Sequence, residues 1–346
     1  MPRCDERQLS AEIKRDDIKP VYLFYGEEGY LKRLYTDRLI KKAVTDLADF
    51  NLHKFDSNVK ADELASAVDA LPMMSERTCV VVRDYNFGSL SDNEHKLLMS
   101  LLTSPNESCV LIFYYDGADA PPKNKKTTQV LDEIDRVGCI VNFERKNERE
   151  LADIASRRAA KAKVVLNPNV ARRLIMRCGT DLENLLTEVD KLCAYVGDRA
   201  ITDEDVDTVV TRTIDASAFA LANAVCSKRR DEAMSICADL FDLRTEPVMI
   251  LGALSAAFVD IYRVKVGESE GLRAQQTADE LNYGKSAFRL RNAAQNGRNM
   301  SRNAAFEALE ILREADLALK STSADGRVVV ERTIVQLLKT AAGDER

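Results

Sequence analysis

The sequence predicts an α/β region built on a parallel sheet, followed by a part of the chain that is entirely helical. Up to about residue 145, short apolar runs typical of strands alternate with segments of helical periodicity, as expected for a parallel sheet covered by helices. Beyond that point the strand signals stop and helix-capping sequences recur. We therefore expect an α/β domain over residues 1–145, a small all-helical domain over 146–212 and a second helical domain over 213–346.

Five segments of the first domain have the composition expected of strands. They are Val21–Tyr25, Phe50–Phe55, Thr78–Arg83, Cys109–Tyr115 and Cys139–Phe143. The fourth is apolar throughout, as expected for a strand that is buried on both faces of a sheet. Helical patterns lie between these segments, near residues 30–44, 62–72, 92–102 and 127–136.

The helical part of the chain is divided by clear start signals. Thr180–Glu183 and Thr202–Asp205 are capping boxes that open a helix over 181–196 and a short helix after 202. Pro247 marks a further helix start, because proline is favoured in the first turn. We also expect helices over 147–164, 169–178, 302–320 and 327–341.

The composition is that of a soluble globular protein and excludes several classes of function. The chain has 346 residues and a formal net charge of −6, whereas an autonomous nucleic-acid-binding domain is expected to be basic. A local basic patch remains compatible with this charge. No run approaches the roughly 18 apolar residues of a membrane-spanning helix, and Met1–Arg7 lacks the apolar core of a signal peptide. We expect a cytoplasmic protein that contacts no membrane.

The eight cysteines and two histidines form no metal-binding pattern along the sequence. None of the cysteines belongs to a C-x-x-C pair, and neither His53 nor His95 has a cysteine at ligand spacing. Most of the cysteines lie in apolar stretches and are expected to be buried, reduced thiols. We expect no metal and no cofactor.

The loop after the first strand has the position of a phosphate-binding loop without its chemistry. The pattern G-x-x-x-x-G-K-[ST] cradles phosphates with backbone N–H groups, while its lysine reaches the outer phosphates and its hydroxyl binds Mg²⁺. Here the loop is shorter, carries two carboxylates that repel phosphate, and consists of Gly26, Glu27, Glu28 and Gly29. Tyr30-Leu31 stand where the lysine and hydroxyl are needed. We predict that this loop binds no nucleotide.

The end of the fourth strand is also incomplete as a catalytic site. Asp116 follows Cys109–Tyr115 at the position of a magnesium-binding carboxylate, but Gly117 comes next instead of a catalytic glutamate. We expect a vestigial site with no catalytic residue. An active ATPase is the first alternative to this interpretation.

Several segments, from about residue 18 to about 340, occur in the order and spacing of one known family. They are Pro20–Glu28, Leu71–Arg77 followed by Cys79–Val82, Leu182–Leu192 followed by Ile201-Thr202, and the pair Asp316 and Lys320. In these segments the chain resembles the bacterial DNA polymerase III delta subunit, a clamp-loader subunit of the AAA+ class. The resemblance implies an AAA+-like α/β domain, a helical lid domain and a helical collar domain.

The resemblance also implies a non-enzymatic role in an ATP-driven complex. Delta subunits bind the ring-shaped beta sliding clamp and open one of its interfaces, so that the ring can be placed on primed DNA. The gamma/tau and delta prime subunits are the implied partners, and ATP is bound and hydrolysed on neighbouring subunits. Such a chain is catalogued with DNA-directed DNA polymerase only because it belongs to the polymerase III holoenzyme.

Met73 and Met74 match the hydrophobic pair with which this family fills a pocket on the clamp. Leu71 belongs to the same predicted surface and also ends an apolar stripe, with Leu64 and Val68, that is expected to pack helix 62–72 on the sheet. Because the pair precedes the third strand, we expect it at the edge of the sheet opposite the Gly26–Gly29 loop. The alternative is that both methionines belong to the core.

A basic stretch near the carboxy terminus is a second candidate interface. Between residues 281 and 306 there is no acidic residue, and the basic ones are Lys285, Arg289, Arg291, Arg298 and Arg302. The stretch is expected either to face DNA phosphates or to pair with acids of a neighbouring subunit. Two further alternatives follow. One is a delta prime-like subunit, opposed by the absence of a zinc-binding cysteine cluster and a Ser-Arg-Cys motif. The other is a DNA-binding regulator that uses this stretch.

Overall fold

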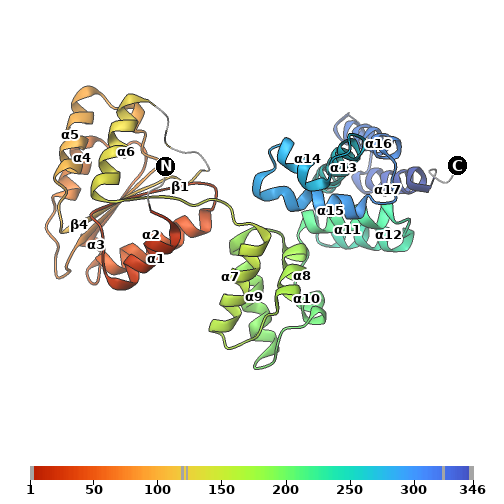
Figure 1. The fold of residues 1–346 in the computed structure, drawn as a ribbon, viewed down its shortest axis with the longest axis horizontal. Coiled ribbons are helices and arrows are strands. Elements are labelled where there is room, and N and C mark those ends of the chain that lie inside the picture. The colour runs from red at the N-terminus through yellow and green to blue at the C-terminus, as the bar shows by residue number, and fades with distance from the viewer. Residues whose placement is uncertain (1–3, 118–120, 122–123, 322–323, 343–346) are drawn as a thin grey trace. The chain divides into compact units, whose positions relative to one another are not determined.

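The computed structural model describes residues 4–117, 121, 124–321 and 324–342, which form two compact units, Met1–Arg145 and Lys146–Arg346 (Figure 1). The elements of the first unit are α1 (Glu6–Arg15), β1 (Val21–Tyr25), α2 (Gly29–Ala43), α3 (Ala48–Asn51), β2 (Leu52–Phe55), α4 (Ala61–Val68), β3 (Thr78–Arg83), η1 (Phe87–Ser89), α5 (Asp92–Thr103), β4 (Cys109–Tyr114), α6 (Lys125–Val137) and β5 (Cys139–Asn142).

The first unit is built on a five-stranded sheet in the order β2-β3-β4-β1-β5, and every pair of neighbouring strands is parallel. Helices α4, α5 and α6 cover one face of this sheet, while α1 and α2 lie on the other (Figure 1). Successive side chains of a strand point to opposite faces. Accordingly, Val21 and Leu23 join the core under α4–α6, and Phe24 packs edge-on against Phe143. The predicted fold class is confirmed.

The elements of the second unit are all helical within the described residues. They are α7 (Glu148–Lys161), α8 (Pro168–Cys178), α9 (Leu182–Val196), α10 (Asp203–Val209), α11 (Ile214–Cys226), α12 (Arg230–Asp242), α13 (Pro247–Ser269), α14 (Ala274–Glu280), η2 (Gly284–Ala287), α15 (Phe288–Asn296), α16 (Arg302–Ser321) and α17 (Gly326–Ala342). The capping box predicted at Thr202–Asp205 opens α10. Helix α9 is capped instead by Asp181, which accepts from the Asn184 N–H. The predicted division of this unit near residue 212 remains a prediction.

Helix α13 corrects the expectation that no segment is apolar and long enough to cross a membrane. By length and hydropathy alone, Pro247–Ser269 could do so. In the structure it packs against α11, α15 and α16, and Leu254, Phe258 and Ile261 are buried in the common core of these helices. Its apolar character is therefore that of a central helix in a helical bundle.

Two local predictions in the first unit need correction, and one helix was not predicted. Helix α1 was not expected from the sequence; Asp5 caps it by accepting a hydrogen bond from the Gln8 N–H. Residue Phe50, predicted to begin a strand, lies in the short helix α3 instead. The helix predicted over 62–72 ends at Val68. Pro72 disfavours helical backbone at the residue before it, so the helix does not extend to the predicted end.

Candidate functional site

The segment between α4 and β3 lies at the edge of the sheet where the strands begin. Because all the strands are parallel, the Gly26–Gly29 loop, which follows β1, lies at the opposite edge. The two predicted sites are therefore separated by the length of the strands, because all the strands run in the same direction. The segment before β3 contains Leu71, Met73 and Met74.

These three apolar side chains are exposed in the isolated chain. Leu71 is 83% exposed, Met74 81% and Met73 50%. The exposure of Leu71 contradicts the prediction that it packs on the sheet with Leu64 and Val68, which are both buried. Leu71 lies beyond the end of α4, so the helical periodicity no longer determines its direction. Exposed apolar groups gathered in one short segment are typical of a protein-binding surface.

Phe50 is a further exposed apolar residue at this edge, and it was not among the residues predicted from the sequence to form a site. It is 58% exposed and immediately precedes Asn51, which contacts the Met73 backbone. The sequence predicted Phe50 to begin a strand, because aromatic residues are common in strands. The missing signal was Asn51, the residue after it: Asn51 Nδ2 donates to the carbonyls of Asp46 and Leu47, which closes the turn of α3.

The side chain of Asn51 is hydrogen-bonded to both the C=O and the N–H of Met73. Asn51 Nδ2 donates to Met73 O at 2.7 Å, and Met73 N donates to Asn51 Oδ1 at 2.8 Å. Asn51 is fully buried, so these hydrogen bonds form where water does not compete. The amide thus fixes the segment while the Met73 side chain remains half exposed.

A second attachment follows Met74. Ser75 Oγ donates to Ala43 O at 3.2 Å and accepts from Thr45 N at the same distance, which ties the segment to the end of α2. Met74 itself has a φ of 50°, in the left-handed region that non-glycine residues rarely adopt. Such a conformation persists only where the surrounding structure imposes it. The two attachments, at Met73 and Ser75, do so here.

At the opposite edge, the Gly26–Gly29 loop is bonded to its own domain. The Glu28 N–H, which would face a phosphate in a nucleotide-binding loop, donates to Phe143 O at 2.8 Å. Gly26 has a φ of 110°, and a Cβ on it would lie 2.6 Å from the same carbonyl oxygen. Arg145 adds an ion pair to Glu27 at 3.7 Å. The loop therefore turns a backbone donor inward rather than toward a ligand.

A buried lysine occupies the end of β4. Lys32 Nζ donates to three successive carbonyls, those of Tyr115 at 2.6 Å, Asp116 at 3.0 Å and Gly117 at 2.8 Å. Burial lowers the pKa of Lys32, while the carboxylates of Asp116 and Asp84 oppose that shift. No sequence pattern marked this lysine, which lies within an ordinary helical segment. It places an ammonium group of the chain itself beside Asp116, the residue at the predicted magnesium-binding position.

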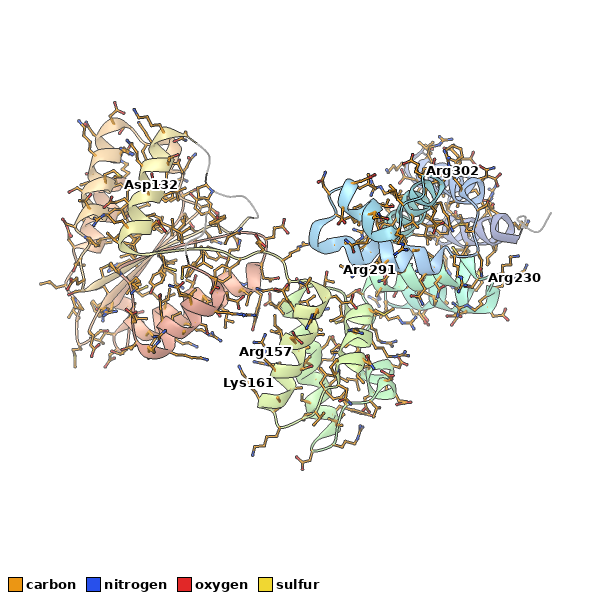
Figure 2. All side chains as sticks on the ribbon, viewed as in Figure 1. Asp132, Arg157, Lys161, Arg230, Arg291 and Arg302 are labelled. Carbon is orange, nitrogen blue, oxygen red and sulfur yellow. The ribbon has the colours of Figure 1, made fainter. Side chains whose placement is uncertain are left out.

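The predicted basic stretch is only partly available to a partner. Arg289 Nη2 is paired with the buried carboxylate of Asp260 at 2.9 Å, so Arg289 stabilises the helical core. Arg298 and Arg302 are exposed and have no ion pair within the described part of the chain. Figure 2 shows Arg291 and Arg302 on different helices, α15 and α16. The side chain of Lys285 lies outside the described residues.

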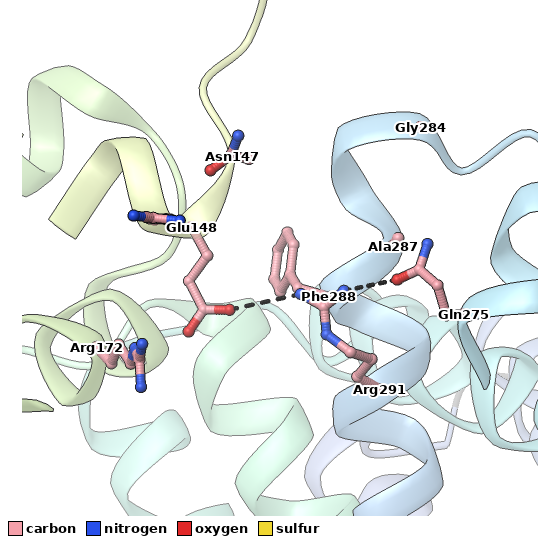
Figure 3. Close-up of a pocket in the computed structure, with 9 residues that line it drawn as sticks. Asn147, Glu148, Arg172, Gln275, Gly284, Ala287, Phe288 and Arg291 are labelled. Atoms are coloured by element: carbon pink, nitrogen blue, oxygen red, sulfur yellow. Dashed lines mark hydrogen bonds and ion pairs between the residues drawn. The ribbon is translucent and has the colours of Figure 1, made fainter. Parts of the chain in front are cut away.

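Arg291 lines a cavity of about 580 Å³ in the second unit. Its guanidinium donates to Gln275 Oε1 at 2.8 Å and lies 3.8 Å from Glu148 Oε2, as Figure 3 shows. Arg149 and Arg172 line the same cavity. Arg291 thus joins α15 to α7, and its charge is partly neutralised by Glu148.

The fold and its two edges define a protein with a parallel α/β unit, a loop after β1 that is bonded to its own domain and an exposed apolar edge. Two family models match this chain. "DNA polymerase III, delta subunit" matches residues 22–144, and "DNA polymerase III delta subunit, C-terminal domain" matches residues 215–337. The chain belongs to the DNA polymerase III delta subunit family, which is part of the clamp loader used in DNA replication.

Curated relatives and a solved structure agree with this assignment. The DNA polymerase III subunit delta of Bacillus subtilis is 28% identical over 94% of this chain and 95% of its own length. The probable subunit delta of Aquifex aeolicus is 21% identical over 79% of this chain and 76% of its own length. The structure of the Bacillus subtilis DNA clamp loader delta protein covers 96% of this chain and 99% of that chain, with 25% identity and a TM-score of 0.70.

Proposed function

We propose that this chain binds the beta sliding clamp and opens its ring for loading on primed DNA. The contact is made by Leu71, Met73 and Met74, which project from the edge of the sheet where the strands begin. The observation that carries the proposal is that these side chains are exposed while the backbone between them is held by Asn51 and Ser75. Phe50 extends the same apolar surface.

Physical chemistry supports a small apolar contact of this kind. Burying a methionine side chain fully contributes roughly 1.5–3 kcal/mol. Methionine is flexible and polarizable, so it adapts to a pocket shaped by other apolar residues. A backbone that is fixed before binding loses less conformational entropy on association, so more of this energy remains as affinity.

We further propose that the chain neither binds nor hydrolyses ATP. The support is twofold: the Glu28 N–H is bonded to Phe143, and the Lys32 ammonium lies against the carbonyls of Asp116 and its neighbours. Nucleotide chemistry is then left to the gamma/tau subunits, with delta prime as a further partner. The carboxy-terminal helices join the collar of this cytoplasmic complex.

Within the assembled loader we propose that Arg298 and Arg302 contact DNA phosphates. Both side chains are exposed, whereas Arg289 and Arg291 are engaged inside their own unit. Contacts of this kind are electrostatic and weaken as the salt concentration rises. DNA binding by the isolated chain at moderate salt, without the clamp or other subunits, would instead favour a DNA-binding regulator.

The experiment that tests clamp binding compares the isolated full chain with a Met73→Ala/Met74→Ala variant by titration calorimetry. Truncating both side chains removes about 2–4 kcal/mol, so the dissociation constant for the clamp should rise at least about thirtyfold. A Met176→Ala/Met249→Ala variant is the matched control, since these methionines are similarly exposed in the second unit. Unchanged clamp affinity in the Met73→Ala/Met74→Ala variant would exclude these two residues as the clamp contact. No binding by the wild type would remove the proposed function.

A further inference from the structure

Two cysteines far apart in the sequence meet a glutamate at the start of β5. The Sγ atoms of Cys4 and Cys139 and a carboxylate oxygen of Glu12 all lie within 4.8 Å of one another. All three residues are buried. The cluster lies at the edge where the strands begin, apart from the exposed segment before β3, and the proposed function does not use it.

Two elements of the fold, α1 with the residues before it and β5, bring these ligand atoms together. Cys4 precedes Asp5, the cap that fixes where α1 begins. Glu12 lies on the buried side of α1, among residues such as Leu9 and Ile13. Cys139 opens β5 and is paired in register with Tyr22 of β1. The cluster therefore joins the amino-terminal helix to the sheet.

The carboxylate of Glu12 is incompletely satisfied. Its Oε1 accepts from Gln8 Nε2 at 3.1 Å, whereas Oε2 is buried with no hydrogen-bond partner among the residues that the structure describes. Glu12 is only 8% exposed. A buried acceptor without a hydrogen-bond partner is costly. The two thiols beside the Glu12 carboxylate can serve as the other protein ligands of a metal ion.

We propose that Cys4, Glu12 and Cys139 bind a zinc ion, with water as the fourth ligand. Thiolate and carboxylate are both established zinc ligands, at about 2.3 Å for sulfur and 2.0–2.2 Å for oxygen. A tetrahedral ion with these bond lengths places its ligand atoms about 3.5–3.8 Å apart. The ligand atoms of the cluster lie within 4.8 Å of one another, which is close to that separation. Both thiols lose their protons when the ion binds.

The bound ion stabilises the attachment of α1 to the sheet. Metal binding that occurs only in the folded state contributes its free energy to folding. This role concerns the stability of the first unit and does not depend on clamp binding. The sequence-based expectation of no metal rested on ligand spacing along the chain, which does not detect ligands that only the fold brings together.

The test is the zinc content of the full chain, purified under reducing conditions and measured by mass spectrometry. About one zinc ion per chain is expected, and Cys4→Ser should lower metal affinity at least about tenfold. Co²⁺ added to the metal-free chain should give an absorption band of thiolate–metal charge transfer, which Cys4→Ser removes. Cys178→Ser, at a buried cysteine of the second unit, is the matched control and should retain the metal.

Circular dichroism separates loss of the site from loss of the fold. If Cys139→Ser unfolds the chain, Cys4→Ser carries the test, because Cys4 lies outside the regular elements. Wild-type chain that takes up neither Zn²⁺ nor Co²⁺ would overturn the proposal, as would metal content that survives Cys4→Ser. A disulfide between Cys4 and Cys139 that persists under reducing conditions would also overturn the proposal.

Discussion

Asn51 and Met73 are joined by two hydrogen bonds, one in each direction, between a buried side-chain amide and an exposed segment of backbone. The amide acts here as the neighbouring strand of a sheet would, since it satisfies both the N–H and the C=O of one residue. The consequence is that the backbone of Met73 is fixed while the side chains of Met73 and Met74 stay exposed. This relationship links the packing of α3 to the proposed clamp contact.

Replacing Asn51 by alanine should weaken clamp binding while Met73 and Met74 remain in place. The segment would then have to be ordered on binding, and we expect the dissociation constant to rise about three- to tenfold. The loss of buried hydrogen bonds should also lower the free energy of unfolding by about 1–3 kcal/mol. Titration with the clamp and urea denaturation measure the two effects.

The control for this prediction is Asn184→Ala in the second unit. Asn184 Nδ2 also donates to a backbone carbonyl, that of Cys178 at 2.8 Å, so a loss of stability is expected there too. Clamp affinity should not change. Equal weakening of clamp binding in both variants would mean that general destabilisation, and not the Asn51 contact, explains the result.

Gly26→Ala should lower the free energy of unfolding by at least about 1–2 kcal/mol, because a left-handed backbone disfavours a side chain. The new Cβ would also approach Phe143 O to 2.6 Å. Gly252→Ala is the opposite case. Gly252 lies in α13, where an added Cβ would meet nothing within 4 Å, so the substitution should raise the free energy of unfolding by about 0.5–1 kcal/mol. Thermal and urea unfolding distinguish the two directions. A stabilised Gly26→Ala chain would contradict the closed-loop geometry.

Lys32→Met should lower the free energy of unfolding by about 1–3 kcal/mol, because it removes the donor from three carbonyls, of which that of Tyr115 is buried and cannot turn to water. Methionine keeps the length of the stem, so the main change is the loss of the ammonium. Lys41→Met, on the exposed side of the same helix α2, should have little effect. If the two variants are equally stable, the Lys32 contacts contribute nothing to the fold.

Asp205 should make stability depend on acid pH. Its carboxylate accepts from Arg199 Nη2 at 2.6 Å and from Thr202 N at 2.9 Å, and the Arg199 hydrogen bond is the main reason that its pKa lies well below the usual range. A lowered pKa stabilises the folded state above the unfolded value of about 3.9, and this stabilisation is lost as the pH falls below it.

The corresponding variant is Asp205→Ala, which also removes half of a capping box. It should be about 1 kcal/mol less stable than wild type at pH 7. That difference should shrink as the pH falls from about 5 to 3, where the carboxyl begins to take up a proton in the unfolded chain. Urea denaturation across this range measures it. A difference that stays constant with pH would exclude the charged contacts as its origin.

Local patterns were sufficient to predict most of the first unit. The strands β1, β3 and β4 begin at the predicted residues, because continuous apolar runs bounded by turn residues have few other stable conformations. Besides the missed helix α1, two errors fall where a short segment satisfies two patterns at once. Phe50 has strand composition but lies in α3, and Leu71 continues the helical period of α4 but follows its end.

The sequence by itself determined the α/β class, the order of the strands, the incomplete nucleotide loop and the family. These follow from the local arrangement of apolar, glycine and capping residues. Only the tertiary structure decided that Asn51 holds Met73, that Lys32 meets the end of β4, and that Cys4 approaches Cys139. The physical reason is that each of these contacts joins residues distant along the chain, and their distance in space depends on how whole helices pack on the sheet.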